Sequence, residues 1–252
     1  MQNRYTGDIG DYGKLSLLRS LVAAGLRTGV NWYLTPDETH NKDGRFIHYL
    51  DDSAYRHCDP ELWEELGRIV TSGERRVQAL ESRSVLDAVF FRDILDLGSV
   101  PAAERAALRA EWHHRALNTL QGCDIVFADP DNGLMVPSAR KGKKGGKYVL
   151  PEELSAYYQQ GASVIYYQHK ARRPDSFYIQ QHLELLNSGC FPRARGLGLK
   201  FRTISQRYYW FLLQPQHTQT VLTCAEDFLR GYWKEHFSLC TLREEVPRWN
   251  WD

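Results

Sequence analysis

The residues best suited to chemistry lie in one short stretch, from Cys123 to Gly133. Residues 125–128 form a short apolar run rich in β-forming residues, typical of a strand buried on both faces of a parallel sheet. Asp129, Asp131 and Asn132 follow it in a turn. Ligands of open α/β sheets bind beyond the carboxyl ends of the strands, so these three side chains are predicted to be catalytic. The alternative is an Asx turn, in which they bond only to their own backbone.

Other polar residues also follow predicted strands. His169 comes soon after the strand at 163–167, and it is predicted to act as a general base or, alternatively, to be structural. Asp37 follows a strand at 30–34, and Asp93 follows a third strand. Asp37 is predicted to complete a metal or cofactor-ribose site together with three further side chains of its loop: Glu38, His40 and Asp43. The alternative is that this loop is only a polar surface loop.

The N-terminal segment is rich in glycine and aspartate and leads into a leucine-rich helix. Asp11 is placed to cap this helix. Asp8, Asp11 and Lys14 are predicted to approach the same edge of the sheet as the acidic turn. In the alternative interpretation Asp11 is only a cap and Lys14 is a solvated charge.

A strongly basic segment follows the acidic turn. Residues 140–147 contain five cations and three glycines and no apolar residue, so a flexible loop is predicted. Such a loop can track a phosphate backbone by releasing counterions, whereas the alternative is a solvated surface loop. The predicted substrate-binding cations are Arg140, Lys141, Lys143, Lys144, Lys147 and Lys170.

Strand and helix patterns alternate along the chain. Helices are predicted at 60–71, 101–120, 151–160, 175–187 and 225–237, and the strands of a hairpin at 197–204 and 208–213. Alternation with long crossovers predicts an α/β fold with a mostly parallel sheet flanked by helices. The hairpin predicts antiparallel strands at its C-terminal end. No break in composition marks a boundary, so residues 1–252 are predicted to form one domain.

Bulk composition gives no global argument for a partner. The 252 residues carry a net charge of +1, so affinity for nucleic acid must come from a local patch. The five cysteines are widely spaced, which argues against a zinc ribbon or a disulfide framework and suits a reducing compartment. No run of 18 apolar residues or signal-peptide pattern is present. A cytoplasmic protein that does not bind membranes is predicted.

This layout resembles the class I (Rossmann-like) methyltransferase fold, which ends in such a reversed strand. Gly7, Asp11 and Lys14 match the G-x-x-x-D-x-x-K segment that opens the ribosomal RNA adenine-N6 methyltransferases of the D-P-P-Y type. The run I-V-F-A followed by Asp129 and Pro130 resembles the start of that family's D-P-P-Y loop, in which the Asp and the backbone accept the target amino group. The chain then departs from the motif, with Asp at position 131 and Asn at position 132.

The resemblance implies a nucleic acid or nucleotide as substrate and S-adenosylmethionine as cofactor, and it assigns no metal. The cofactor would lie near Asp8, Asp11, Lys14, Asp37 and Asp93. Two alternatives stay open. In one, Asp129 or Asp131 with Gln168 and Lys170 would serve a Mg²⁺-dependent nuclease or phosphoesterase. In the other, the chain is a non-catalytic partner subunit that binds nucleic acid.

Overall fold

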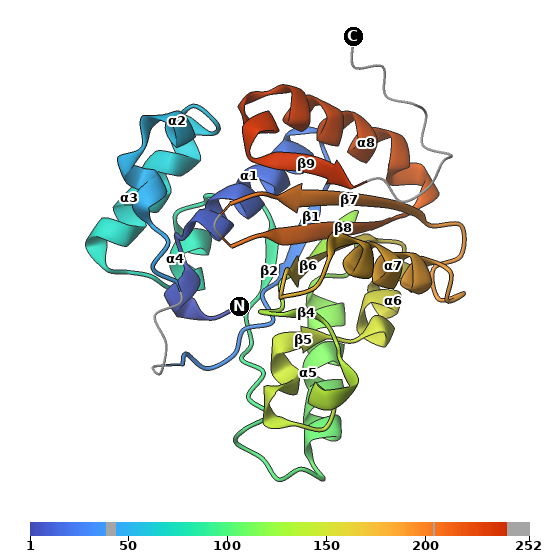
Figure 1. The fold of residues 1–252 in the computed structure, drawn as a ribbon. Coiled ribbons are helices and arrows are strands. Elements are labelled where there is room, and N and C mark those ends of the chain that lie inside the picture. The colour runs from blue at the N-terminus through green and yellow to red at the C-terminus, as the bar shows by residue number, and fades with distance from the viewer. Residues whose placement is uncertain (39–43, 204, 241–252) are drawn as a thin grey trace.

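The fold is built around a mixed sheet of seven strands, in the order β2-β1-β3-β6-β8-β7-β9 (Figure 1). The computed structural model describes residues 1–38, 44–203 and 205–240. The strands of this sheet are β1 (Thr28–Asn31), β2 (Val89–Phe91), β3 (Ile125–Ala128), β6 (Ser163–His169), β7 (Arg195–Phe201), β8 (Arg207–Leu213) and β9 (Phe237–Cys240). A second sheet pairs β4 (Gly133–Leu134) with β5 (Tyr148–Val149).

Half of the large sheet is parallel and half is antiparallel. Strands β2, β1, β3 and β6 run parallel to their neighbours, whereas β8 reverses beside β6 and β7 and β9 each reverse again. The predicted α/β fold and the antiparallel C-terminal hairpin are therefore confirmed. The parallel part covers less of the sheet than predicted.

The sheet has a topological switch point at β1. The chain enters the sheet at β1, adds β2 on one side and later adds β3 on the other. The crossover helices leave β1 and β3 in opposite directions, which opens a crevice beyond their carboxyl ends. This crevice is where a ligand is expected in such a sheet.

Helices cover both faces of the large sheet. Figure 1 shows α1 and α8 on one side and α5, α6 and α7 on the other. Alternate residues of β8 accordingly face two separate hydrophobic clusters, with Tyr209 and Phe211 in one and Tyr208 and Trp210 in the other. The helices are α1 (Ile9–Ala23), α2 (Ser53–Arg56), α3 (Pro60–Ser72), α4 (Val77–Ser82), α5 (Arg105–Thr119), α6 (Pro151–Gln159), α7 (Asp175–Leu186) and α8 (Pro215–Arg230).

The C-terminal region differs from its prediction. A helix at 225–237 was expected, but α8 begins ten residues earlier, with Pro215 in its first turn, and ends before Gly231. Thr218, Val221 and Ala225 lie at helical spacing on its buried face. Phe237 then starts β9, which pairs with β7. In the part of the chain that the structure describes, no helix combines the length and apolarity needed to cross a bilayer.

Candidate functional site

A polar cavity of about 270 Å³ lies beyond the carboxyl ends of the parallel strands. It is bounded by the first turn of α1, by the turn after β3 and by the adjoining ends of β6 and β8. Separate predicted site residues meet here: Asp8, Asp11, Lys14, Asp129, Asp131, Asn132, Lys147 and His169. The acidic turn and the histidine that ends β6 therefore share one cavity.

The first turn of α1 positions two of these side chains. Asp8, not Asp11 as predicted, is the N-cap, because its carboxylate accepts a hydrogen bond from the Asp11 N–H at 3.0 Å. Asp11 lies inside the helix, and its side-chain Oδ2 accepts a hydrogen bond from the Gly7 N–H at 3.0 Å. Asp11 and Lys14 are then one turn apart on the same face of α1, where such side chains meet.

Lys14 joins α1 to the acidic turn. Its ammonium lies 2.7 Å from Asp11 and 2.6 Å from Asp129, and all three side chains are buried. Burial raises the pKa of both carboxyl groups, against the opposing effect of Lys14. Burial by itself lowers the pKa of Lys14, but the two carboxylates raise it more, so the lysine stays charged. One cation therefore serves two buried carboxylates, and the cluster binds a proton more readily than isolated aspartates do.

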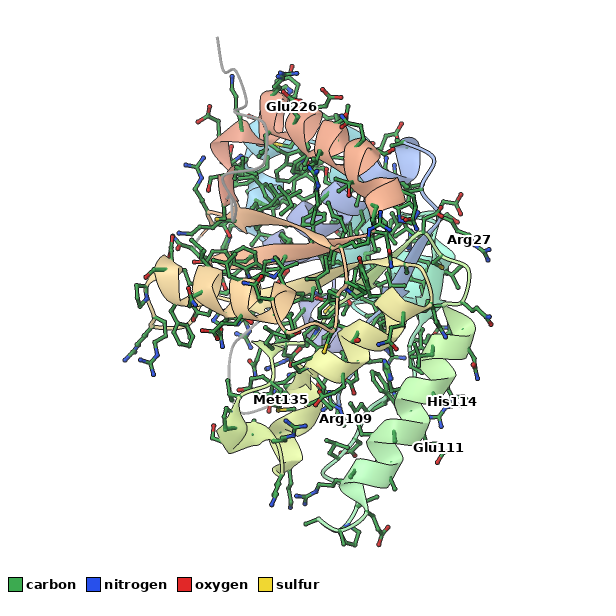
Figure 2. All side chains as sticks on the ribbon, turned by 90° about the vertical axis from the view of Figure 1, so that its right-hand side faces the viewer. Arg27, Arg109, Glu111, His114, Met135 and Glu226 are labelled. Atoms are coloured by element: carbon green, nitrogen blue, oxygen red, sulfur yellow. The ribbon has the colours of Figure 1, made fainter. Side chains whose placement is uncertain are left out.

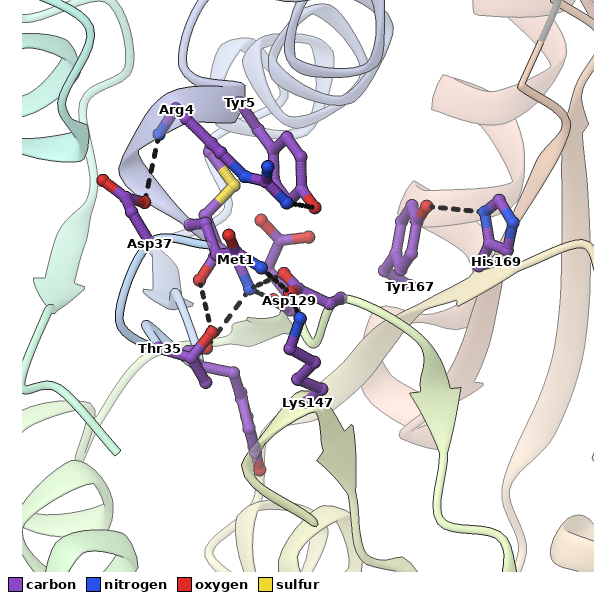
Figure 3. A network of polar contacts seen from close by, with 12 residues as sticks. Met1, Arg4, Tyr5, Thr35, Asp37, Asp129, Lys147, Tyr167 and His169 are labelled. Carbon is purple, nitrogen blue, oxygen red and sulfur yellow. Dashed lines mark hydrogen bonds and ion pairs between the residues drawn. The ribbon is translucent and has the colours of Figure 1, made fainter. Parts of the chain in front are cut away.

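A second cation, the α-amino group of Met1, contacts Asp131. The two charged groups are 2.7 Å apart, and the same amine donates to the backbone carbonyls of Asp129 (2.9 Å) and Tyr33 (3.2 Å). Figure 3 shows Met1 between Thr35 and Asp129, with Lys147 close by. The carbonyl of Tyr33 follows β1 and that of Asp129 follows β3, so Met1 fills the crevice at the switch point.

Tyr33 has a backbone conformation that is rare for a non-glycine residue. Its φ is +43°, in the left-handed region, at the end of β1. The surroundings hold it there, since its N–H donates to the Asn31 side chain at 3.0 Å and its hydroxyl donates to Glu153 at 3.1 Å. A backbone conformation of this kind costs about 1–3 kcal/mol and persists where neighbours over-determine it. The residue with this strained backbone, Tyr33, is also the one whose carbonyl accepts a hydrogen bond from the Met1 amine.

The Asp131 ion pair predicts a pH-dependent loss of stability. Burial opposes ionisation of Asp131, but the Met1 amine, Gln2 and Lys147 lower its pKa below the ordinary value of 3.8. Such a carboxylate stabilises the fold above that ordinary value, and the contribution is lost as pH falls through the lowered pKa. Asp131→Asn is therefore expected to reduce the free energy of unfolding by about 1.5–3 kcal/mol at pH 7. Urea denaturation at pH 7 and pH 3 measures this difference in free energy of unfolding, which is expected to be smaller at pH 3.

Asp37→Asn is the matched control for this measurement. Asp37 is exposed and accepts one long backbone hydrogen bond, from the Arg4 N–H at 3.3 Å. Its replacement is expected to change stability by no more than about 0.5 kcal/mol at either pH. An equal loss for Asp131→Asn at pH 7 and pH 3 would show that the charge of Asp131 contributes nothing.

The side chain of Gln168 holds the acidic turn in place through hydrogen bonds to its backbone. Its side-chain oxygen accepts from the Leu134 N–H at 2.9 Å, and its nitrogen donates to the carbonyl of Asn132 at 2.9 Å. Gly133 is required beside it, since φ is +108° and a Cβ there would lie 2.1 Å from the Gln168 oxygen. The carbonyl of Asn132 also accepts from the His169 N–H at 3.2 Å. These bonds fix Asn132 and His169 relative to each other at the cavity wall.

Several predicted site residues lie away from the cavity. Asp93 is half-exposed and pairs with Arg115 on α5 at 2.9 Å. Lys170 turns toward α7, where its ammonium lies 3.4 Å from Asp175. Asp37, on the surface near Arg4, is not part of the cavity lining either. The predicted loop partners of Asp37 divide, because Glu38 lines the cavity, whereas His40 and Asp43 lie outside the described residues.

The basic segment is more ordered than the predicted loop. It follows the 3₁₀ turn Pro137–Ala139 and contains the 3₁₀ turn Lys143–Lys147, and only Lys147 of its cations lines the cavity. Lys147 lies 2.7 Å from Glu38 and 3.5 Å from Asp131. Arg140 instead pairs with Glu152 at the surface, and the other three lysines are not in the cavity lining: Lys141, Lys143 and Lys144.

Sequence reasoning missed several residues of the cavity wall, among them Met1, Arg207 and Tyr209. The Met1 contact is made by a backbone amine, which no side-chain pattern reveals. Arg207 is the first residue of β8 and stands opposite His169 in the antiparallel pairing. The only sequence signal for Arg207 is its place at the start of a predicted strand of the hairpin.

The ammonium groups of Lys14 and Met1 determine which kind of ligand the cavity can bind. Among the described residues, no three His, Cys, Asp or Glu side chains are grouped to hold a metal ion. Asp129 and Asp131 each contact an ammonium group instead, and Gln168 and Lys170 point elsewhere. The arrangement does not fit Mg²⁺ as the nuclease interpretation requires. It fits a polar ligand that binds to already-paired carboxylates.

The sequence was also compared with known proteins. No model of a protein family matches the chain, and no curated protein sequence matches it.

Proposed function

We propose that the chain is an enzyme that modifies a nucleotide or a nucleic acid, with the reacting group bound in the polar cavity. The observation that carries this proposal is the convergence of the turn after β3 and His169 beyond the carboxyl ends of parallel strands. The reversed strand β8 is the feature of the sheet that the methyltransferase resemblance implies. The most specific form of the proposal is N-methyl transfer.

The lining residues suit a ligand that carries an amino group. The carboxylate of Asp131 and the side chain of Asn132 supply acceptor oxygens for its N–H groups. Lys14 positions Asp129 behind them through the 2.6 Å contact. His169 stands at the same wall, 3.5 Å from the Tyr167 hydroxyl, and accepts a proton released by the reacting group.

S-adenosylmethionine itself fits the cavity less well than a substrate group does. Met1 fills the crevice between β1 and β3, where its amine bonds to two backbone carbonyls. The cavity of about 270 Å³ lies just below the range of roughly 300–1,000 Å³ typical of sites for drug-sized ligands. It therefore suits a single nucleotide better than the larger S-adenosylmethionine.

Two measurements test the proposal. Calorimetry with S-adenosylmethionine and its demethylated product on the pure protein tests the methyl-transfer form, which predicts binding of both. Incubation with methyl-labelled cofactor and pooled RNA, DNA or nucleotides then tests turnover. His169→Gln is expected to lower the rate by about 10²–10⁴-fold, because a general base typically contributes that factor. His114→Gln, an exposed histidine on α5, is the matched control and keeps the rate.

The outcomes separate the three interpretations. Absence of cofactor binding and of label incorporation would end the methyl-transfer form. Metal-dependent cleavage of nucleic acid that Asp129→Ala abolishes would favour the nuclease interpretation instead. Binding of nucleic acid without any turnover would identify a binding subunit.

A further inference from the structure

Arg207 is a buried cation at the cavity with no acidic partner. Its side chain is 7% exposed, and its Nε donates to the Ser205 carbonyl at 2.9 Å. Among the described residues no carboxylate lies within 4.0 Å of the guanidinium, and its two terminal nitrogens have no hydrogen-bond partner. Its Cζ lies 6.0 Å from the ring centre of Tyr167 and 5.7 Å from that of Phe201. The two terminal nitrogens are not among the fully buried polar atoms, and Arg207 lines the cavity, so a ligand there can accept hydrogen bonds from them.

The first turn of α1 makes room for this guanidinium. A Cβ on Gly10 would lie 1.5 Å from the Arg207 Nη1, so only glycine allows the approach. Gly10 is the second residue of the 15-residue helix α1, whose first N–H groups lack intrahelical partners. Those of Ile9 and Asp11 bond to the Phe46 carbonyl and the Asp8 carboxylate, and that of Gly10 has no partner among the described residues. Arg207 and Gly10, whose N–H has no partner among the described residues, thus line the same cavity side by side.

A second wall group points to the same ligand. Tyr209 lines the cavity on β8, two residues after Arg207, and its hydroxyl is buried without a hydrogen-bond partner among the residues described. Burial raises its pKa, so it remains a neutral donor. Two unsatisfied donors on neighbouring positions of one strand face fit a single group that is rich in acceptor oxygens.

Against the opposing effect of burial, Asp8 and Asp11 lie close enough for their charges to raise the pKa of Arg207, but no described carboxylate around the cavity forms an ion pair with it. Asp11 and Asp129 contact Lys14, and Asp131 contacts the Met1 amine. Asp8 accepts the N-capping bond of α1. Among the described residues of the cavity wall, the Arg207 guanidinium is therefore a cationic group that no carboxylate pairs with and that a ligand can contact.

We propose that Arg207, the Gly10 N–H and the Tyr209 hydroxyl form an oxyanion subsite that binds a phosphoryl group of the ligand. The planar guanidinium matches the geometry of phosphate in two parallel hydrogen bonds. This inference rests on the proposed function for its choice of phosphate over carboxylate. It assigns the phosphate contact to β8 and α1, whereas sequence reasoning placed it on the basic segment. A nucleotide would then span the cavity, with its base at the acidic turn and its phosphate at Arg207.

The test uses inorganic phosphate and the whole chain, so it does not depend on any enzymatic activity. Thermal unfolding is followed at constant ionic strength while chloride is exchanged for phosphate or for acetate. Phosphate is expected to raise the Tm of the wild type, and Arg207→Gln and Gly10→Ala to abolish that rise. Arg195→Gln, an exposed arginine on β7, is the matched control and keeps the rise. A wild type that shows no rise, or a full rise in Arg207→Gln, would overturn the subsite.

Further arms identify the source of the oxyanion. A rise with acetate but not phosphate would overturn the phosphoryl assignment. Calorimetry with nucleoside monophosphates and the matching nucleosides is expected to show tighter binding of the monophosphates. Arg207→Gln is expected to weaken monophosphate binding by about tenfold or more while leaving nucleoside binding unchanged. A phosphate response without any modification of nucleotides would support the subsite and count against the proposed function alone. Modification of nucleotides that Arg207→Gln leaves intact would support the proposed function and count against the subsite.

Discussion

Replacement of Lys14 by methionine is expected to lower the free energy of unfolding by about 3–5 kcal/mol at pH 8, the cost of breaking a buried ion pair by removing one partner. The lysine contacts Asp11 and Asp129 at 2.7 and 2.6 Å, and all three residues are buried, so both carboxylates lose their main cationic partner once it is gone. Methionine keeps most of the side-chain volume beside Trp32, so the loss reports charge more than packing. Urea denaturation measures it.

The loss is expected to depend on pH with a defined sign. Burial raises the folded-state pKa of Asp11 and Asp129 above 3.8, and removing Lys14 removes the main opposing effect. A group with a raised pKa gives stability that is present below its ordinary value and is lost as pH rises through the folded value. The stability of Lys14→Met should therefore fall between about pH 4 and pH 8, more steeply than that of the wild type. Lys14→Met should also be closest to wild type at pH 4.

Two further variants separate charge from packing. Lys14→Met combined with Asp129→Asn leaves one carboxylate in the cluster, and it should recover part of the loss at pH 8. Lys234→Met, at an exposed lysine near the C-terminal end, should change stability by no more than about 0.5 kcal/mol. A loss for Lys14→Met that is the same at pH 5 and pH 8 would contradict the proposed charge balance.

The meeting of Asp131 and His169 could be predicted from local sequence patterns. Each follows an apolar run that reads as a buried strand, and the carboxyl ends of neighbouring parallel strands share one sheet edge. Pairing of β3 with β6 is all that the inference requires, because the apolar runs place both side chains close to the carboxyl ends of these strands, although β6 extends to His169 and not only to residue 167. The candidate catalytic side chains are therefore the part of the site that sequence reasoning reached.

Arg207 could not be placed in the same way. Its position depends on β8 pairing antiparallel with β6, in the register that sets Arg207 opposite His169. A shift of one residue would turn Arg207 to the other face of the sheet, and the hairpin sequence alone does not define its register against β6. Gly10 has the same limitation, because its reason for being glycine is the approach of a side chain from nearly 200 positions away.

The charge composition of the basic segment, residues 140–147, did not predict its local structure. Residues 140–147 read as a free basic loop, yet Gly145 and Gly146 are buried against Leu97 and Leu95. The cause lies on α5, where the Arg109 guanidinium donates to the Gly145 carbonyl at 2.8 Å. Composition counts the positive charges of a segment but not the contacts that turn its backbone inward. The phosphate contact was therefore predicted on the segment with the most lysines.

Replacement of Arg109 by methionine is expected to cost about 3–5 kcal/mol of unfolding free energy, because Glu153 is left as a buried, unpaired charge. Arg109, labelled in Figure 2, reaches from α5 to α6, where Nε and Nη2 lie 2.6 and 2.8 Å from the two oxygens of Glu153. Glu153 also accepts from the Tyr33 hydroxyl and from the Leu150 N–H. The ion pair thus supports both the basic segment and the strained residue at the end of β1.

The matched control lies on the same helix. Arg115 pairs with Asp93 at 2.9 Å, but both side chains are nearly half exposed, and exposed ion pairs contribute about 0–1 kcal/mol. Arg115→Met should therefore change urea stability by about 1 kcal/mol at most. Arg109→Met combined with Glu153→Leu replaces the pair by apolar groups and should recover much of the single-variant loss, since a buried pair is often neutral against such residues. Equal losses for Arg109→Met and Arg115→Met would mean that burial adds nothing to this pair, and the support of Tyr33 would need another origin.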